Sequence, residues 1–223
     1  HGTDRFSDPK FNQKYADLAV ETQSIIATLS NIPHQPLRFS DEPNNLEEDP
    51  LLAYTFDKYL DGGDSEWPAV LPMVKSTVRA MDTIVQLAAE ATGHAAAVGK
   101  FVVSGISKRG WTTWLAAAVD SRVVGIVPEV YDSLNSDVQM RHHFKTYGFY
   151  APAVQPYAQK NVFERLRTER GMEMTRFIDP YHYLEQLAIP KLMLNSTGDQ
   201  FFLPDSSRFY FHDLPAPKYL RYI

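Results

Sequence analysis

Apolar residues recur at helical spacing in three segments of the first half of the chain. Asp8-Pro9 pairs an N-cap residue with proline at the first helical position, which predicts a helix running to about Ser30. Asp49-Pro50 repeats this signal and predicts a second helix that stops at Gly62-Gly63. A third helix is expected after Pro72. Its apolar residues step by three and four: Leu71, Val74, Val78, Met81 and Val85.

Beyond residue 99 the pattern changes to short continuous apolar runs, which are typical of strands buried on both faces. Four such runs are expected to be strands: Lys100–Ser104, Arg122–Val127, Lys191–Asn195 and Tyr219–Ile223. The segment Trp111–Val119 lies between the first two and predicts an apolar helix. Strand, helix and strand with short links predict an α/β fold with a mostly parallel sheet, right-handed crossovers and helices on both faces.

The segment 133–187 has a different character, because it is rich in Tyr, Phe, His, Arg and Gln and contains no buried-strand run. In a fold of this type we expect it to be a helical insertion, a cap over the carboxyl ends of the strands. Residues 1–132 and 188–223 would then be the first and last parts of the α/β core. The sequence starts and stops abruptly, at His1 and Ile223, so we expect both ends to be cuts within a longer chain.

Composition narrows the classes of partner. Hydrophobic residues make up 44% of the chain and the net charge is −5, which is typical of a globular domain and offers no basic surface for nucleic acid. No apolar run approaches the roughly 20 residues that span a bilayer. Cysteine is absent, which excludes disulfides, thiolate metal sites and a cysteine nucleophile. We expect a small-molecule or peptide substrate and no cofactor.

The strongest candidate chemistry is the motif Gly105-Ile-Ser-Lys-Arg-Gly110. It stands between a predicted strand and a predicted helix, the context of a nucleophile elbow, in which a sharp turn exposes a serine at the end of a strand. Ser107 would be the nucleophile. Arg109 occupies the position two after the serine where glycine is usual, and Gly110 follows one later. The alternative is that Ser107 only caps the following helix.

In folds with such an elbow, a catalytic triad of serine, acid and histidine follows this order along the chain. The acid lies in a loop after a late strand. Asp199, in the loop after the third predicted strand, fits this order. Glu129 and Asp132 after the second strand are weaker alternatives. Asp205 follows Pro204, and we assign it to helix capping.

The general base is harder to place. His212 is the only histidine after Asp199, and it comes too early, inside the helix expected before the last strand. We expect the base in the turn after Ile223, outside this sequence. His142-His143 point about 100° apart on a helix, so we expect cap packing and no metal site. His182 is also assigned to the cap.

Several blocks resemble the PhoPQ-activated pathogenicity-related protein family, which has an α/β-hydrolase fold. The similar blocks are the elbow through Asp120, Ala53–Tyr59, Trp67-Pro68, Val78–Asp82, Tyr147–Pro152, Gly198–Ser206, Asp213–Pro215 and Lys218–Tyr222. The resemblance implies a serine-hydrolase-like site with Ser107 as nucleophile, Asp199 as acid and a histidine shortly after Ile223. It also implies a preceding strand region, and members of the family include secreted proteins.

We therefore expect an acyl-enzyme on Ser107 that cleaves an ester or an amide. The Lys108 backbone N–H and a donor near Gly2 would bind the oxyanion. By analogy with glucuronoyl esterases, the side chain of Lys108 or Arg109 could assist an oxyanion or a carboxylate, or Arg109 could instead pack on the sheet. The rival interpretation is a non-catalytic α/β-hydrolase scaffold that acts as a secreted signalling or binding protein.

Overall fold

A computed structural model of the chain describes residues 9–94 and 97–223. The chain divides into two compact units, His1–Ile32 and Pro33–Ile223. The described part of the first unit contains the helix α1 (Pro9–Thr22). The predicted continuation to Ser30 is wrong, because Gln23 takes a left-handed φ of 52°, a conformation that ends a helix.

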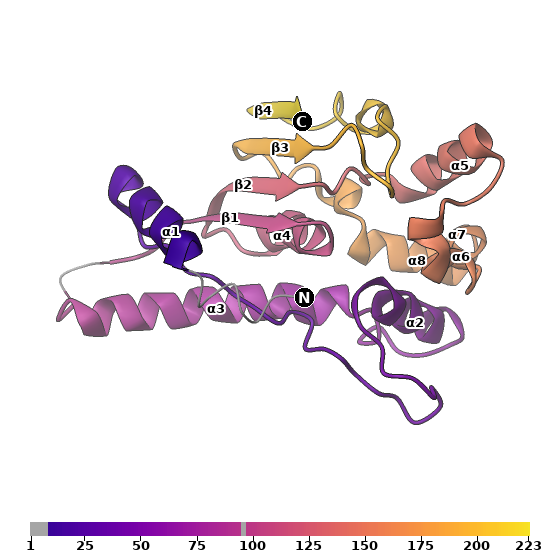
Figure 1. Cartoon of the computed structure of the whole chain (residues 1–223), viewed down its shortest axis with the longest axis horizontal. Helices are drawn as coiled ribbons and strands as arrows, with labels where there is room; N and C mark the ends of the chain where they lie inside the picture. Colours follow the sequence, from indigo (N-terminus) through magenta and orange to yellow (C-terminus); the bar gives the residue numbers. More distant parts are fainter. Residues whose placement is uncertain (1–8, 95–96) are drawn as a thin grey trace. The chain divides into compact units, whose positions relative to one another are not determined.

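A parallel sheet forms the second unit's centre, with the strand order β1-β2-β3-β4. The four arrows in Figure 1 point the same way. The strands are β1 (Phe101–Ile106), β2 (Val123–Glu129), β3 (Lys191–Asn195) and β4 (Lys218–Tyr222). All four runs predicted as strands are confirmed: β3 has the predicted ends, and the ends of the other three are shifted by one or two residues. Because the strands are parallel, their carboxyl ends meet at one edge of the sheet.

Two helices lie on one side of this sheet. The helix α4 (Lys108–Val119) packs on β1 and β2, and α3 (Val70–Ala91) packs on α4. The predicted start of α3 after Pro72 is displaced, because the helix begins at Val70 and Pro72 lies inside its first turn, where the missing N–H costs no hydrogen bond. The helix α2 (Glu48–Leu60) precedes α3 and ends before Gly62, as expected.

The opposite face of the sheet exposes apolar side chains. Exposed and half-buried positions alternate along β1 and β4, and Val102 is 69% and Tyr219 61% exposed. The prediction of strands buried on both faces is therefore wrong for the described residues. An apolar run in the sequence fits a strand with one covered face as well as a strand with two. The run alone therefore cannot predict whether the second face is covered.

The segment between β2 and β3 is helical, as predicted. It contains α5 (Ser136–Tyr147), α6 (Gln155–Ala158), α7 (Val162–Arg165) and α8 (Glu169–Ile178), with 3-10 turns η2 (Pro152–Val154) and η3 (Pro180–Tyr183). The helix predicted around His212 is wrong: a short 3-10 turn, η4 (Ser206–Phe209), precedes the strand β4. No helix among the described residues combines the length and the apolar composition that crossing a bilayer requires.

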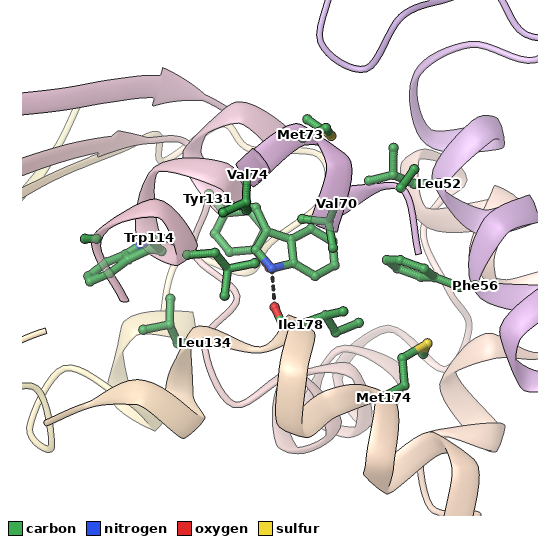
Figure 2. Packing of buried hydrophobic residues seen from close by; sticks show 14 of the residues in the cluster. Leu52, Phe56, Val70, Met73, Val74, Trp114, Tyr131, Leu134, Met174 and Ile178 are labelled. Atoms are coloured by element: carbon green, nitrogen blue, oxygen red, sulfur yellow. Dashed lines mark hydrogen bonds between the residues drawn. The ribbon is translucent and has the colours of Figure 1, made fainter. Parts of the chain in front are cut away.

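One hydrophobic cluster joins these helices to the sheet (Figure 2). It takes Phe56 from α2, Met73 from α3, Trp114 from α4 and Met174 from α8, together with apolar side chains of the strands. The helical segment 133–187 therefore shares its core with the sheet. Its separation as a cap domain stays a prediction.

Candidate active site

Ser107 lies at a sharp turn from strand to helix. The strand β1 ends at Ile106, α4 begins at Lys108, and Ser107 between them has φ 58° and ψ −125°. Residues with a side chain adopt this backbone region rarely, and such strain is concentrated at functional sites. The Ser107 N–H donates to the Glu129 carbonyl oxygen at 2.8 Å, which ties the turn to the end of β2.

The Ser107 side chain makes no capping hydrogen bond to α4, although the residue occupies the N-cap position. The alternative interpretation of Ser107 as a side-chain cap therefore has no support in the structure. Lys108, the first residue of the helix, has a backbone N–H without an acceptor inside α4. This N–H is available to a negative charge that develops beside Ser107.

Two glycines make the turn possible. A Cβ on Gly105 would lie 2.4 Å from the Arg109 carbonyl oxygen, and a Cβ on Gly110 would lie 3.0 Å from the Glu129 carbonyl oxygen. The close approach of strand and helix thus falls on residues 105 and 110. For this reason the position two after the serine can carry an arginine side chain.

Lys108 and Arg109 are engaged by carboxylates at the start of α2. The buried Lys108 Nζ lies 2.6 Å from Glu48 Oε2 and 3.2 Å from Asp49 Oδ2. Arg109 donates to both Glu48 oxygens, at 2.8 and 3.1 Å. This bidentate pair holds the Arg109 guanidinium at the start of α2. Since both cations have carboxylate partners, their charge is largely neutralised beside Ser107.

Glu48 is the centre of this cluster. Burial by itself would raise the pKa of Glu48, but hydrogen bonds from Arg109, Lys108 and Gln35 outweigh burial and lower the pKa to about 2. Glu48 therefore stays ionised at any physiological pH. The sequence did not reveal this cluster, because its members are about 60 positions apart and no local spacing marks the pairing.

Asp199 lies in the loop after β3, as predicted. Its Oδ1 accepts the backbone N–H groups of Phe201 at 2.6 Å and Phe202 at 3.0 Å, which fixes the orientation of the carboxylate. Phe201 and Phe202 line the same cavity as Ser107. The structure thus brings the Asp199 loop and the elbow to the same edge of the sheet.

The alternative acids are held by other partners. Ser104 donates its hydroxyl to Glu129 Oε1 at 2.8 Å. Asp132 is buried and accepts the hydroxyls of Tyr210 at 2.5 Å and Tyr222 at 2.6 Å. Burial raises the pKa of Asp132 to about 6, against the lowering effect of the two tyrosines. Sequence reasoning missed both tyrosines, which come from distant segments.

The described histidines lie outside the cavity wall of Ser107. His212 and His182 are exposed. His142 binds both carboxylate oxygens of Asp205 at 3.0 Å, and the adjacent His143 is buried and accepts the Ala151 N–H at 3.0 Å. Asp205 occupies the N-cap position of η4, but its side chain makes no capping hydrogen bond and pairs with His142 and Arg208 instead.

No group of three or more potential metal-ligating side chains occurs within residues 9–94 and 97–223. Gly2, the predicted site of a second oxyanion donor, lies outside the described residues.

The cavity beside Ser107 has a volume of about 90 Å³ and mostly apolar walls. Apolar side chains come from five helices: Phe56 of α2, Trp111 of α4, Met140 of α5, Phe163 of α7 and Ile178 of α8. Asp49 and Lys108 lie at its polar side. The arrangement combines a half-buried serine, a helix N-terminus and a small apolar space.

Comparison with known proteins agrees with the motifs. The family described as PhoPQ-activated pathogenicity-related protein matches residues 1–223. Autocrine proliferation repressor protein A of Dictyostelium discoideum is 38% identical over 210 residues, which are 92% of this chain and 42% of that protein. The chain thus spans less than half the length of this curated relative.

Solved structures of α/β hydrolases superpose in part. The Pyrococcus horikoshii acylaminoacyl peptidase gives a TM-score of 0.47 at 16% identity, over 70% of this chain and 23% of that chain. An acetyl xylan esterase from Paenibacillus sp. R4 gives 0.45 at 21% identity, over 67% of this chain and 46% of that chain. The family assignment does not depend on these superpositions. On the match over its whole length, the chain belongs to the PhoPQ-activated pathogenicity-related protein family.

Proposed function

We propose that the protein is a serine hydrolase that cleaves an ester or an amide through an acyl-enzyme on Ser107. The observation that carries the proposal is the strained backbone of Ser107, φ 58° and ψ −125°, between a parallel strand and a helix. Strain of this kind persists only where the surrounding structure enforces it. Here Gly105, Gly110 and the bond to the Glu129 carbonyl enforce it.

In the proposed reaction, Ser107 Oγ bonds to the substrate carbonyl carbon and a histidine takes the hydroxyl proton. The Lys108 N–H donates to the resulting oxyanion. The histidine then protonates the leaving alcohol or amine, and water hydrolyses the acyl-serine by the same steps. Asp199, held by two backbone N–H groups, orients the histidine. In this proposal the histidine and the second oxyanion donor belong to parts of the protein outside the described residues.

The helical segment 133–187 would act as the cap of this site. Met140, Val154, Phe163 and Ile178 all come from this segment and form walls of the Ser107 cavity. A cap that excludes water strengthens every electrostatic interaction with the developing oxyanion.

A fluorophosphonate probe on the full-length protein tests the proposal. We expect one labelled serine, identified as Ser107 by mass spectrometry, and no labelling of the folded Ser107→Ala variant. Ser136→Ala is the matched control, because Ser136 lines the same cavity but belongs to α5 and not to the elbow, and its labelling should equal that of the wild type. Absence of labelling, or labelling that survives Ser107→Ala, would contradict the proposal.

A second candidate is a non-catalytic scaffold that acts as a secreted signal. The observation in its favour is the 38% identity to a protein named as a repressor of proliferation. A Ser107→Ala variant that keeps full repressor activity in a cell-proliferation assay would favour this candidate.

A further inference from the structure

Two hollows lie on either side of one thin wall. The inner hollow is the cavity of about 90 Å³ that contains Ser107. An outer hollow of about 190 Å³ lies over α5 and α7. Met140 and Phe163 line both hollows. These two side chains therefore form the partition between them.

The inner hollow suits a short hydrocarbon group. Most of its lining is apolar, and the charged groups at its polar side, Asp49 and Lys108, are paired with one another at 3.2 Å. An engineered apolar cavity of about 150 Å³ binds benzene. The space of about 90 Å³ beside Ser107 is smaller than that cavity, so it favours a short acyl chain over a long one.

The outer hollow has a polar rim and an aromatic floor. Asp137 on this rim pairs with Arg141 at 2.9 Å and with Arg167 at 3.1 Å. Tyr150 and Phe163 form the aromatic part, with ring centroids 4.7 Å apart. Both hollows are partly open to solvent, and they share the lining side chains Met140 and Phe163.

Phe163 packs against two tyrosine rings. Its ring lies 4.7 Å from the ring of Tyr150 and 6.0 Å from that of Tyr157. Tyr157 is fixed in turn by a hydrogen bond from its hydroxyl to Asp49 at 2.9 Å. Met140, the other side chain of the partition, is buried. Two positioned side chains are thus common to both hollows.

We propose that Met140 and Phe163 set the acyl-chain length of the substrate, so that the site takes esters or amides of short-chain carboxylic acids. This inference rests on the proposed function of Ser107. A short acyl group fills the inner hollow while its carbonyl carbon lies at Ser107. A longer chain meets the ring of Phe163, and removal of that ring joins the two hollows into one channel.

The test is the chain-length profile of the full-length protein on p-nitrophenyl butyrate and octanoate. We expect the wild type to favour butyrate at least tenfold in kcat/KM. Phe163→Ala should raise the octanoate-to-butyrate ratio at least tenfold, and Met140→Ala should shift it in the same direction. Phe144→Ala is the matched control, because Phe144 contacts Tyr150 but lines neither hollow, and its ratio should equal that of the wild type.

A ratio unchanged in both wall variants, or a wild type that hydrolyses both esters equally well, would overturn the inference. Binding of 1-butanol and 1-octanol, followed by tryptophan fluorescence, separates this outcome from failure of the proposed function. If Ser107 is not labelled by fluorophosphonate, the proposed function fails, but tighter binding of 1-octanol to Phe163→Ala would still support the partition. Equal binding of 1-octanol to wild type and variant would count against it.

Discussion

The backbone of Ser107 has a conformation that is unfavourable for a residue with a side chain. The neighbouring Gly105 and Gly110 allow the strand and the helix to approach closely enough to hold it there. The sequence identified the serine and Gly105 through the motif and its position between strand and helix. It could not show that Gly110 replaces the usual glycine at position 109. The role of Gly110 depends on how closely α4 approaches the Glu129 carbonyl oxygen. Helix and carbonyl belong to separate segments, so the sequence does not give their distance.

We predict that Gly105→Ala lowers the free energy of unfolding by about 3 kcal/mol or more, because the new Cβ would lie 2.4 Å from the Arg109 carbonyl oxygen. The matched control is Gly99→Ala, since a Cβ at Gly99 has no neighbour within 4 Å. This control should change stability by less than about 0.5 kcal/mol. Urea unfolding of the two variants checks the difference, and equal stabilities would show that the elbow tolerates a side chain.

The ion pairs of Lys108 lead to a second prediction at this scale. Lys108→Met removes the buried cation between Glu48 and Asp49 and should cost about 2–4 kcal/mol of stability, since two partly buried carboxylates lose a partner. The loss is smaller than for a fully buried pair, because Glu48 is 29% exposed and keeps Arg109. Lys75→Met, at an exposed lysine of α3, should change the unfolding midpoint in urea very little. If both variants unfold at the same urea concentration, the pairing contributes nothing.

Among the elements, two tryptophans of α4 have different roles. Trp111 donates its Nε1–H to the Ile178 carbonyl oxygen at 2.5 Å, the bond drawn dashed in Figure 2, and so ties α4 to the end of α8. The Nε1 of Trp114 is buried and has no hydrogen-bond partner in the described part of the chain. The two residues remove similar volume when replaced by phenylalanine, so they form a matched pair.

We predict that Trp111→Phe destabilises the protein by about 1–3 kcal/mol more than Trp114→Phe does, because it leaves the buried Ile178 carbonyl without its donor. Chemical denaturation of both variants under one condition measures the difference. A larger loss for Trp114→Phe would mean that packing, and not the hydrogen bond, dominates at this helix.

The elements themselves were the most predictable level of the fold. The short apolar runs located all four strands, and the steps of three and four located α3. The exposed face of the sheet could not be predicted, because one apolar run serves a strand with one or two covered faces. The partners of Asp132 and Glu48 were equally hidden, since both sets join residues far apart in the sequence.

On the scale of the whole second unit, Asp132 connects the end of β2 to Tyr222 of β4 and to Tyr210. Its pKa is raised by burial to about 6 from an ordinary value of 3.8, with Asp199 and Asp205 adding to the effect. The folded state therefore binds the proton more tightly than the unfolded state between these values. The stabilisation of the folded state by the protonated Asp132 carboxyl is fully present below about pH 4 and is lost as the pH rises through 6.

We predict that Asp132→Asn, which cannot titrate, gains stability relative to the wild type by about 2 kcal/mol between pH 4 and pH 7.5. Denaturant unfolding of both proteins at the two pH values measures this double difference, in which other titrating groups cancel. A difference that is the same at both pH values would show that Asp132 is ionised throughout the range.

The strand order β1-β2-β3-β4 also has a consequence for synthesis on the ribosome. Each strand joins the sheet at the edge left by the strand made just before it, so the sheet can grow in the order of translation. The longest wait is the stretch of about sixty residues between Glu129 and Lys191, roughly 3–12 s at 5–20 residues per second. During that interval the nascent chain exposes the unpaired edge of β2. The nascent chain is then most at risk of pairing through this edge with a strand of another chain.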